Sequence, residues 1–585
     1  MRFRTLRKWD DLEGTEALLF CAQMLEELLF DYTLDTYKPS AMNASLLCSE
    51  ALMCAADIEK GLIDKNNLKY IIEELSQVIR RDPVVKRLLS LDVDSVLRSI
   101  EGGHERIADK KVVLELVAYE LSLKRYKEMN ESLLSEVVKA NGRKSDIRVV
   151  VRSYVTTLIN FGYESKYLYK KCLDFFYYGS ERIKGNHNID DFIDIFKKEP
   201  DEYVAIYKAS GIFSVISDSC ENIDINVSKG ADDYSGFISS SGFSNITSDQ
   251  VYVVVKGISA LDMYAAKAMA EDRMEVMSTL MKLFHHKERP DWEGRCLMVN
   301  ESKGTGVIVD IPVNTMHRCI DLKPEKASLK LNQLINGFSL HQGSFTKFAR
   351  SAELHSLALD SDSRENQMIN LWIALESLIP SSAKELSKIQ KLIDAIMPFI
   401  NIVYVQRLVE RFVADLFNWS PAALNRAVKG IPGGKIYVKI AKVLTQEEFK
   451  GRREKLFQDF GDFVLLRNRA FQIGEMISKG SKVSETIKIH DQRVRWQIRR
   501  IYRSRNMIVH SGVTLSFTDI LIENLHDYLD IVMSKLVALA SGEVNINTID
   551  QGFKYVAINY ESYLKFLDKN KDGFSNESIE KLFLR

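Results

Sequence analysis

The chain has 585 residues, enough for about three or four domains of usual size. Its 80 basic and 80 acidic residues cancel, so no global field attracts nucleic acid or a membrane, and a nucleic-acid site must rest on a local patch. Seven scattered cysteines without a CxxC pair favour reduced thiols over a disulfide framework. No export signal and no run of about 20 apolar residues is visible, so we expect a cytoplasmic protein with no membrane partner.

Residues 1–145 are predicted to form a helical N-terminal domain. Apolar residues recur at helical spacing through about residues 10–140. The first stripe consists of Leu18, Leu19, Met24, Leu25, Leu28 and Leu29. No catalytic cluster occurs in this part of the sequence, so we expect it to act in sensing or interaction.

Residues 146–350 are predicted to form an α+β middle domain, because helical periodicity gives way to short strand-like runs. The predicted helices and strands are 149–178 (interrupted near Gly162), 203–207, 222–227, 251–255, 260–285, 297–299 and 307–309. The Ser/Gly-rich segment 228–248 is expected to be an exposed, flexible loop. Residues 303–306 are expected to form a hairpin turn.

Residues 351–541 return to helical periodicity and are predicted to form an up-and-down bundle. The predicted helices are 366–378, 383–396, 403–417, 446–477, 491–509 and 516–539. Pro398 is expected to end the second of them. The tail, 542–585, is expected to combine a strand at 555–558 with a final short helix. The fold class is therefore mainly α with an α+β middle domain.

The predicted helix at 491–510 lies in a strongly basic part of the sequence. The basic residues are Lys479, Lys482, Lys488, Arg493, Arg495, Arg499, Arg500, Arg503 and Arg505. Only Glu485 and Asp491 oppose them. In a chain of zero net charge this asymmetry suits phosphate binding, and the alternative is a solvated helix face. The apolar stripe that would pack the helix consists of Val494, Ile498, Ile501 and Ile508.

The last turns of this helix contain Arg503, Arg505, Asn506 and His510, followed by Gly512. Glycine is preferred just past a helix end, so His510 should sit at the negative end of the helix dipole, which favours its protonated form. A histidine beside an arginine suits acid/base work on a phosphodiester, and the alternative is a C-capping histidine without chemistry. On an ideal helix Arg505 and His510 are about 140° apart, whereas Arg503 shares the face of His510.

The run Arg505–His510 resembles the Arg-x4–6-His signature of HEPN domains, including the polar residue that often follows the arginine. Upstream, the helix Leu371–Leu378 resembles the first helix of the ApeA-like branch of that superfamily, and Ile501–Arg505 also fits that branch. The similarity covers about 365–540. More weakly, Val253–Ala270 resembles the strand and helix that precede the HEPN domain in such proteins.

The resemblance implies a C-terminal HEPN-type helical bundle that forms a homodimer or higher oligomer. It also implies a metal-independent endoribonuclease that needs no cofactor. In such enzymes the RNA 2′-hydroxyl attacks the adjacent phosphate, which gives a 2′,3′-cyclic phosphate and a 5′-hydroxyl. His510 would then be the general acid/base, Arg505 would stabilise the charge on the phosphorane, and Asn506 would orient these groups or bind phosphate. ApeA-like proteins are associated with bacterial antiviral defence by abortive infection, so a phage-derived trigger is expected.

Four further residues are assigned supporting roles. Arg499, Arg500 and Arg503 are expected to contact RNA, or else to be surface arginines. Glu376 is expected to hold one of the arginines, because a carboxylate on an apolar helix is costly unless paired; the alternative is a position at the edge of the buried face. Two other functions remain open. One is a catalytically silent HEPN protein that binds RNA or a partner, and the other is an effector subunit whose N-terminal helices dock onto another protein.

Three further motifs are not expected to bind a ligand. The run Asp568–Gly573 begins like a calcium loop, but Ile579 occupies the position of the bidentate glutamate. The glycines of Gly430–Lys435 lack phosphate-loop spacing, and a turn is the simpler interpretation. The pair His285–His286 has no Cys or carboxylate neighbours at metal-ligand spacing and is interpreted as a helix end.

Overall fold

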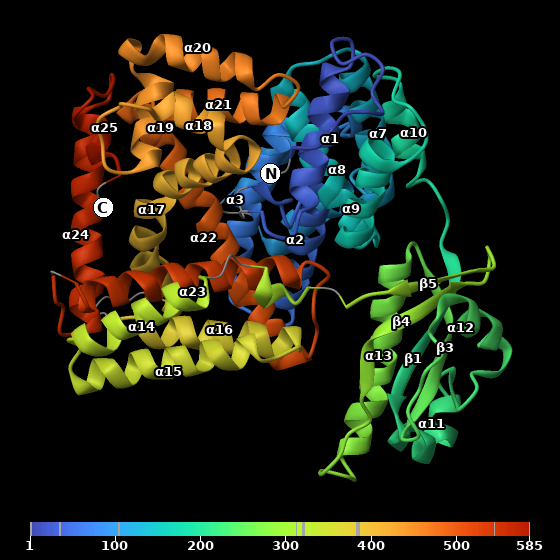
Figure 1. Ribbon diagram of the computed structural model, residues 1–585. Helices are drawn as coiled ribbons and strands as arrows, with labels where there is room; N and C mark the ends of the chain where they lie inside the picture. Colours follow the sequence, from blue (N-terminus) through green and yellow to red (C-terminus); the bar gives the residue numbers. More distant parts are fainter. Residues whose placement is uncertain are drawn as a thin grey trace.

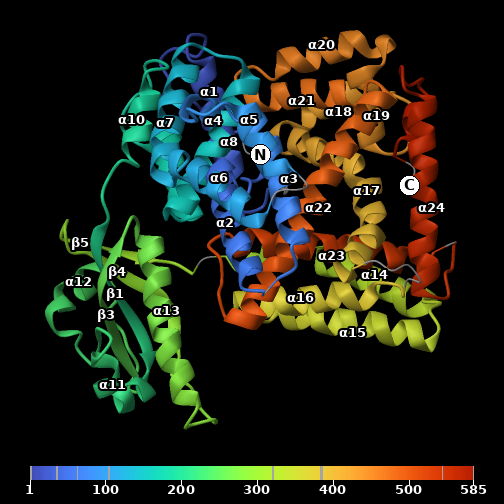
Figure 2. The ribbon, with the colours of Figure 1, turned by 180° about the vertical axis from the view of Figure 1, so that it is seen from behind.

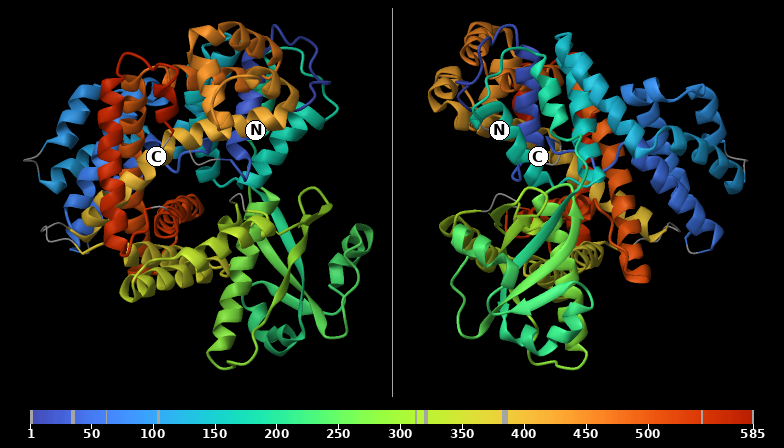
Figure 3. Two further views of the ribbon diagram at one scale, coloured as in Figure 1. Left: turned by 60° about the vertical axis from the view of Figure 1, so that its left-hand side comes forward. Right: turned by 90° about the vertical axis from the view of Figure 1, so that its right-hand side faces the viewer.

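The computed structural model describes residues 3–33, 37–61, 63–102, 106–311, 313–318, 322–381, 387–542 and 544–583. Most of the chain is helical, and a five-stranded antiparallel sheet lies in the middle of the sequence. The predicted class, mainly α with an α+β middle, is confirmed at this level. The sheet and its helices form a unit beside a larger helical body, at the lower right of the ribbon (Figure 1) and below the body in a second view (Figure 3, left).

The N-terminal helices form a compact group that extends past the predicted boundary at residue 145. They are α1 (Glu16–Leu29), α2 (Ala44–Glu59), α3 (Asn66–Arg81), α4 (Pro83–Leu88), α5 (Val93–Glu101), α6 (Ile107–Glu120), α7 (Leu123–Lys139), α8 (Lys144–Phe161), α9 (Ser165–Leu173) and α10 (Asn188–Asp194). Gly162 ends α8 with a φ of +117°, as expected from the predicted interruption. Because α8 packs on α1 and α7, and α9 on α1, the group continues to about Phe196.

The sheet unit begins at residue 201 and not at 146. Its strands are β1 (Asp201–Ser210), β2 (Ile225–Ser228), β3 (Gln250–Ala260), β4 (Trp292–Asn300) and β5 (Thr305–Val309), in the order β2-β3-β1-β4-β5. The predicted hairpin between the last two strands is confirmed, and Gly304 lies in its turn with a φ of +63°. Two short helices, α11 (Ser217–Glu221) and α12 (Ser235–Ser241), also belong to this unit. The prediction of a flexible loop at 228–248 is therefore wrong, because α12 lies within it.

Alternate residues of β1 point to opposite faces of the sheet and build two separate cores. Tyr203, Ala205 and Tyr207 pack with α13 (Met263–Lys282), the helix predicted at 260–285. On the other face, Val204 and Ile206 pack with the side chains of α12 and the segment after it. Because each face has its own covering element, the unit encloses its cores without the helical body.

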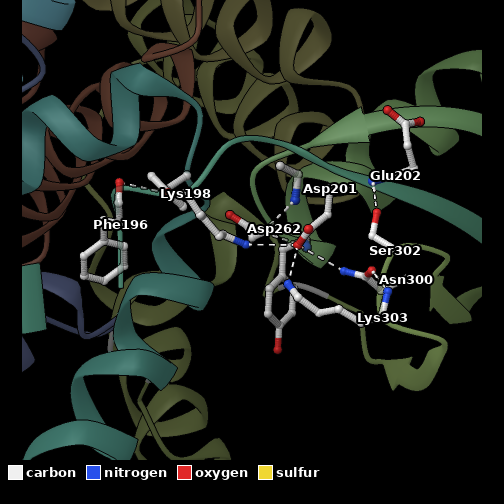
Figure 4. Close-up of polar contacts among 11 residues, drawn as sticks. Phe196, Lys198, Asp201, Glu202, Asp262, Asn300, Ser302 and Lys303 are labelled. Atoms are coloured by element: carbon white, nitrogen blue, oxygen red, sulfur yellow. Dashed lines mark hydrogen bonds and ion pairs between the residues drawn. The ribbon is translucent and has the colours of Figure 1, made fainter. Parts of the chain in front are cut away.

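Two aspartates lie where the sheet unit joins the helical body (Figure 4). The buried carboxylate of Asp262 caps α13 and also accepts a hydrogen bond from the backbone N–H of Glu164, between α8 and α9, at 2.9 Å. Asp201, at the start of β1, accepts from the Nζ of Lys303 at 2.6 Å and lies 3.5 Å from the Nζ of Lys198. These contacts fix the first strand and the main helix of the unit against the end of the N-terminal group.

The remaining helices form the C-terminal part of the body. They are α14 (Pro324–Gly337), α15 (Gln342–Leu359), α16 (Arg364–Leu378), α17 (Lys388–Trp419), α18 (Pro421–Val428), α19 (Ile436–Thr445), α20 (Lys450–Asp459), α21 (Val464–Met476), α22 (Gly480–Ser511), α23 (Thr518–Ala540), α24 (Ile549–Lys569) and α25 (Ser578–Lys581). The long helix α22 lies between α17 and α3 in opposite views (Figures 1 and 2) and contacts both. It therefore joins the N-terminal group to the C-terminal helices.

Several predicted elements of this part are corrected. Pro398 lies inside α17, so the predicted break at this residue is wrong: its neighbours Met397 and Phe399 are buried, and their packing offsets the missing backbone hydrogen bond. The predicted start of that helix, at 383, lies outside the described residues. Residues 446–477 form α20 and α21 instead of one helix. The strand predicted at 555–558 is part of α24, which begins with a capping box.

The two predicted domain boundaries, between residues 350 and 351 and after residue 541, also differ from the structure. The helix α15, which the predicted boundary between residues 350 and 351 would divide, packs on α16. The helix α24, predicted as tail, packs on α17 and α22. Both helices therefore belong to the C-terminal bundle. Within the described residues, α17 is the one helix long and apolar enough to cross a membrane. Most of its apolar window is buried inside the protein, as is typical of a core helix.

Candidate functional site at the end of α22

The apolar stripe of α22 fixes which way the candidate site points. Val494, Ile498, Ile501 and Ile508 are all buried, as predicted. The helix ends at Ser511, and Gly512 closes it with a φ of +64° and an N–H···O bond of 3.0 Å to the carbonyl of Ile508. Glycine meets little steric resistance in this left-handed conformation. The predicted stop after the candidate motif is confirmed.

The three predicted catalytic residues lie within two turns of each other on α22. The Nη1 of Arg505 donates to the Oδ1 of Asn506 at 3.0 Å. The Nε of Arg505 is buried and meets no hydrogen-bond acceptor among the described residues. His510 is exposed in the last turn, and neither Arg505 nor Asn506 hydrogen-bonds to its ring in this part of the chain. The structure thus brings Arg505 and Asn506 together and leaves His510 facing solvent.

Arg500 and Arg503 do not form the exposed RNA-binding face that the sequence predicts. Arg500 is buried, and its Nη2 donates to Glu50 of α2 at 2.9 Å and to Glu74 of α3 at 2.5 Å. The Nη2 of Arg503 donates to the other oxygen of Glu50 at 2.6 Å. Both arginines are therefore paired with carboxylates of the N-terminal group, which corrects their predicted place on a solvated face, and their contact with RNA stays a prediction.

The electrostatics of this cluster differ between its two carboxylates. Burial alone would raise the pKa of Glu50, but the charges and hydrogen bonds of Arg500 and Arg503 outweigh it and lower this pKa to about 2. Burial keeps the pKa of Glu74 raised despite Arg500. Burial would also lower the pKa of Arg500, yet the two carboxylates raise it. Glu50 is thus the main counter-charge of the pair of arginines.

Arg499 is also covered. Its guanidinium carbon lies 3.4 Å from the ring centroid of Tyr70 on α3, and its Nη2 donates to Gln390 of α17 at 2.5 Å. Burial lowers the pKa of Arg499 because it lacks a paired carboxylate strong enough to compensate. Arg499 therefore does not lie on an exposed helix face, because Tyr70 of α3 and Gln390 of α17 cover it, and its contact with RNA stays a prediction.

Glu376 is exposed and does not hold an arginine among the described residues. Its Oε2 accepts a hydrogen bond from the indole Nε1 of Trp372, one turn earlier in α16, at 3.1 Å. The Trp372 ring packs against Tyr502 of α22 with centroids 5.5 Å apart. The alternative interpretation, a carboxylate at the edge of the buried face, is the one that fits. Among the described residues, the contact that Trp372 makes between α16 and α22 is an aromatic pair instead of the predicted ion pair.

One group of functional side chains was not predicted. His355 of α15 meets His526 and Asp530 of α23, with one possible ligand atom of each residue within 4.8 Å of the others. The spacing of His526 and Asp530, four residues apart on a predicted helix, could have drawn attention to them, because such residues share a face. Nothing in the sequence places His355 beside them.

The run Asp568–Gly573 is a polar turn at the end of α24. The carbonyl of Asn570 accepts from the backbone N–H of Gly480 at 2.9 Å, and the carbonyl of Lys571 accepts from the hydroxyl of Ser481 at 2.7 Å. The turn therefore anchors the start of α22.

Comparisons of the chain with protein-family models, curated proteins and solved structures found no match.

Proposed function

We propose that the protein is a HEPN-type, ApeA-like endoribonuclease of the cytoplasm that cuts RNA without a catalytic metal. The observation that carries the proposal is the end of α22. There, Arg505 is held by Asn506 at 3.0 Å, and an exposed His510 follows in the last turn before Gly512. This arrangement supplies a cation and a titratable group beside solvent, which are the two kinds of group that phosphodiester cleavage needs. The sequence resemblance supplies the reaction.

In this mechanism His510 takes the proton from the 2′-hydroxyl, and the 2′-oxygen attacks the adjacent phosphorus. The bond from phosphorus to the 5′-oxygen breaks, the 5′-oxygen takes a proton from solvent and His510 returns its proton to solvent, so the products are a 2′,3′-cyclic phosphate and a 5′-hydroxyl. Arg505 stabilises the negative charge that gathers on the phosphorane oxygens. Its enclosed Nε is a donor suited to such an oxygen, because a buried donor without an acceptor costs about 1–3 kcal/mol.

A single helix does not present both groups to one phosphate. Arg505 and His510 are about 140° apart around the axis of a regular helix, and α22 stays helical through both residues. Arg503, which shares the face of His510, is bound to Glu50. We therefore propose a homodimer, or a higher oligomer, in which Arg505 of one chain and His510 of its partner act on the same phosphate.

The role in defence rests on the sequence resemblance. In that role the N-terminal group would receive a phage-derived trigger, and its contact with α22 gives a route from trigger to site. Glu50 and Glu74 reach α22 a few residues before Arg505. A change in α2 or α3 would therefore alter the helix that carries the candidate motif.

The test is RNA cleavage by the purified full-length protein in the presence of EDTA, with the 3′ ends of the products analysed for cyclic phosphate. We expect cleavage by the native protein and its loss in His510→Ala and Arg505→Ala. His187→Ala, an exposed histidine outside the candidate site, is the matched control and should cleave normally. Unchanged cleavage by His510→Ala would overturn the assignment of the site.

A second candidate is a catalytically silent protein that binds RNA or a partner through α22. The absence of a hydrogen bond from Arg505 or Asn506 to His510 among the described residues favours it, because catalysis needs the groups to converge. Intact RNA together with retained RNA binding in the same assay would establish this alternative.

A further inference from the structure

His355, His526 and Asp530 converge between α15 and α23. The Nε2 of His526 lies 3.4 Å from one carboxylate oxygen of Asp530, and the Nε2 of His355 lies 3.6 Å from the other. The two imidazole rings are tilted, with centroids 4.9 Å apart. His526 is buried, the His355 side chain is 19 % exposed and the Asp530 side chain is 42 % exposed, so the cluster lies at the edge of the core and solvent reaches it from the side of Asp530.

These separations are long for direct charge-assisted hydrogen bonds, which measure about 2.7–2.9 Å. The Nε2 of His355 is enclosed and has no hydrogen-bond partner among the described residues. An enclosed ring nitrogen without a partner is costly. The two imidazoles and the carboxylate place three possible metal-ligand atoms within 4.8 Å of one another. A cation between these atoms would bind all three.

We propose that these three residues form a binding site for a divalent transition metal of the zinc class. Two imidazole nitrogens and one carboxylate suit zinc, whereas calcium and magnesium prefer sites made of oxygen. In a tetrahedral zinc site with bonds of about 2.0–2.1 Å, neighbouring ligand atoms lie about 3.3 Å apart. The two nitrogen–oxygen separations, 3.4 and 3.6 Å, each to a different oxygen of Asp530, are close to this value. The widest separation, within 4.8 Å, closes with a small rotation of one ring. Water would complete the coordination.

The site connects two helices that are distant in the sequence. His526 and Asp530 are four residues apart and lie on one face of α23, while His355 comes from α15. Both helices pack on α16. The metal would therefore hold α15 and α23 together around α16. Since α23 directly follows the end of α22, the metal would stiffen the support of the candidate motif without taking part in cleavage. The site does not depend on the proposed ribonuclease activity.

The test is zinc binding by the full-length protein after removal of metal with a chelator. Equilibrium dialysis against ZnCl2, with metal analysis of the protein, should give one tightly held equivalent. His355→Gln and His526→Gln should each weaken binding at least tenfold. The control variant His187→Ala, which changes an exposed histidine elsewhere, should bind zinc as the native protein does.

Cobalt in place of zinc should give the visible absorption of a tetrahedral centre, and His526→Gln should remove this absorption.

Less than a tenth of an equivalent of zinc on the native protein would overturn the proposal, as would native binding by both glutamine variants. Folding is checked separately: zinc should raise the melting temperature of the native protein and leave that of His355→Gln unchanged. An equal rise in both would also overturn the proposal. None of these measurements uses RNA, so failure of the metal site and failure of the ribonuclease are distinguishable. The EDTA cleavage assay should accordingly be run well below the melting temperature of the metal-free protein.

Discussion

The guanidinium groups of Arg500 and Arg503 both bind the carboxylate of Glu50. In the sequence Glu50 lies 450 residues before Arg500. The basic character of this helix was visible in the sequence, and so was the candidate motif at its end. The partners of the arginines were not, because an ion pair between distant helices depends on how they pack and leaves no local pattern. Arg500 and Arg503 therefore bind the N-terminal group, whereas Arg495 binds Asp394 and Asp491 on the other side of α22. Arg505 is the arginine of the candidate motif that takes part in neither contact.

We predict that Glu50→Gln destabilises the protein by about 3 kcal/mol, because it leaves the buried Arg500 and the half-buried Arg503 without their shared carboxylate. The matched control is Glu74→Gln, which should cost less than about 1 kcal/mol. Burial already disfavours the charge of Glu74, and a glutamine oxygen can still accept from Arg500. Urea unfolding at pH 7 measures both values. Equal losses in the two variants would contradict the unequal roles assigned to the carboxylates.

The destabilisation caused by Glu50→Gln should depend on pH. The pKa of Glu50 is lowered from 4.5 to about 2 by folding, so its carboxylate stabilises the protein fully above about pH 4.5. This stabilisation is lost as the pH falls through the folded value. The difference in unfolding free energy between the native protein and Glu50→Gln should therefore shrink between about pH 4.5 and pH 2. A difference that stays constant over this interval would show that Glu50 acts by packing and not by charge.

At the scale of elements, the sequence predicted what local chemistry decides. The sequence predicted the glycines at the ends of α8 and α22, the hairpin at Gly304 and most of the helices, because each of these features depends on residues close in sequence. Tertiary packing decided the rest. The helix α17 continues past Pro398 because the residues around the proline are buried. The β-branched and aromatic residues at 555–558 favour a strand, but they lie in a helix that packs on α17 and α22. The domain boundaries failed for the same reason, since helices from different segments share one core.

The end of α22 gives a prediction at this scale. Gly512→Ala places a side chain on a residue with a φ of +64°, which should cost about 1 kcal/mol and loosen the turn that carries His510. Gly304→Ala is the matched control, because its φ is +63°, no heavy atom lies near either added methyl group, and it sits in the remote hairpin. Both variants should lose similar stability by thermal melting, but only Gly512→Ala should reduce RNA cleavage, by about tenfold. An equal loss of cleavage in both would indicate a general effect of instability.

At the scale of the whole molecule, the N-terminal group and the C-terminal helices form one body around a shared core. The buried Glu27 of α1 and Asp415 of α17 both bind Arg469 of α21, so the two parts are joined by polar contacts as well as apolar ones. The sheet unit keeps separate cores and meets the body at the polar contacts of Asp201 and Asp262 and at Leu261, which packs into the core of the body.

The proposed dimer gives a prediction that only an assembly of chains can meet. If Arg505 of one chain works with His510 of its partner, a mixed dimer of Arg505→Ala and His510→Ala holds one site with both residues and one with neither. Each variant alone should be inactive. After equal amounts are mixed and allowed to exchange, half of the dimers are mixed and each has one site, so cleavage should recover to about one quarter of the native rate. Recovery should follow the rate of subunit exchange, which is measurable with differently labelled chains.

No recovery after proven exchange would mean that both residues act within one chain. The last turns of α22 would then have to depart from the regular helix to bring His510 to Arg505.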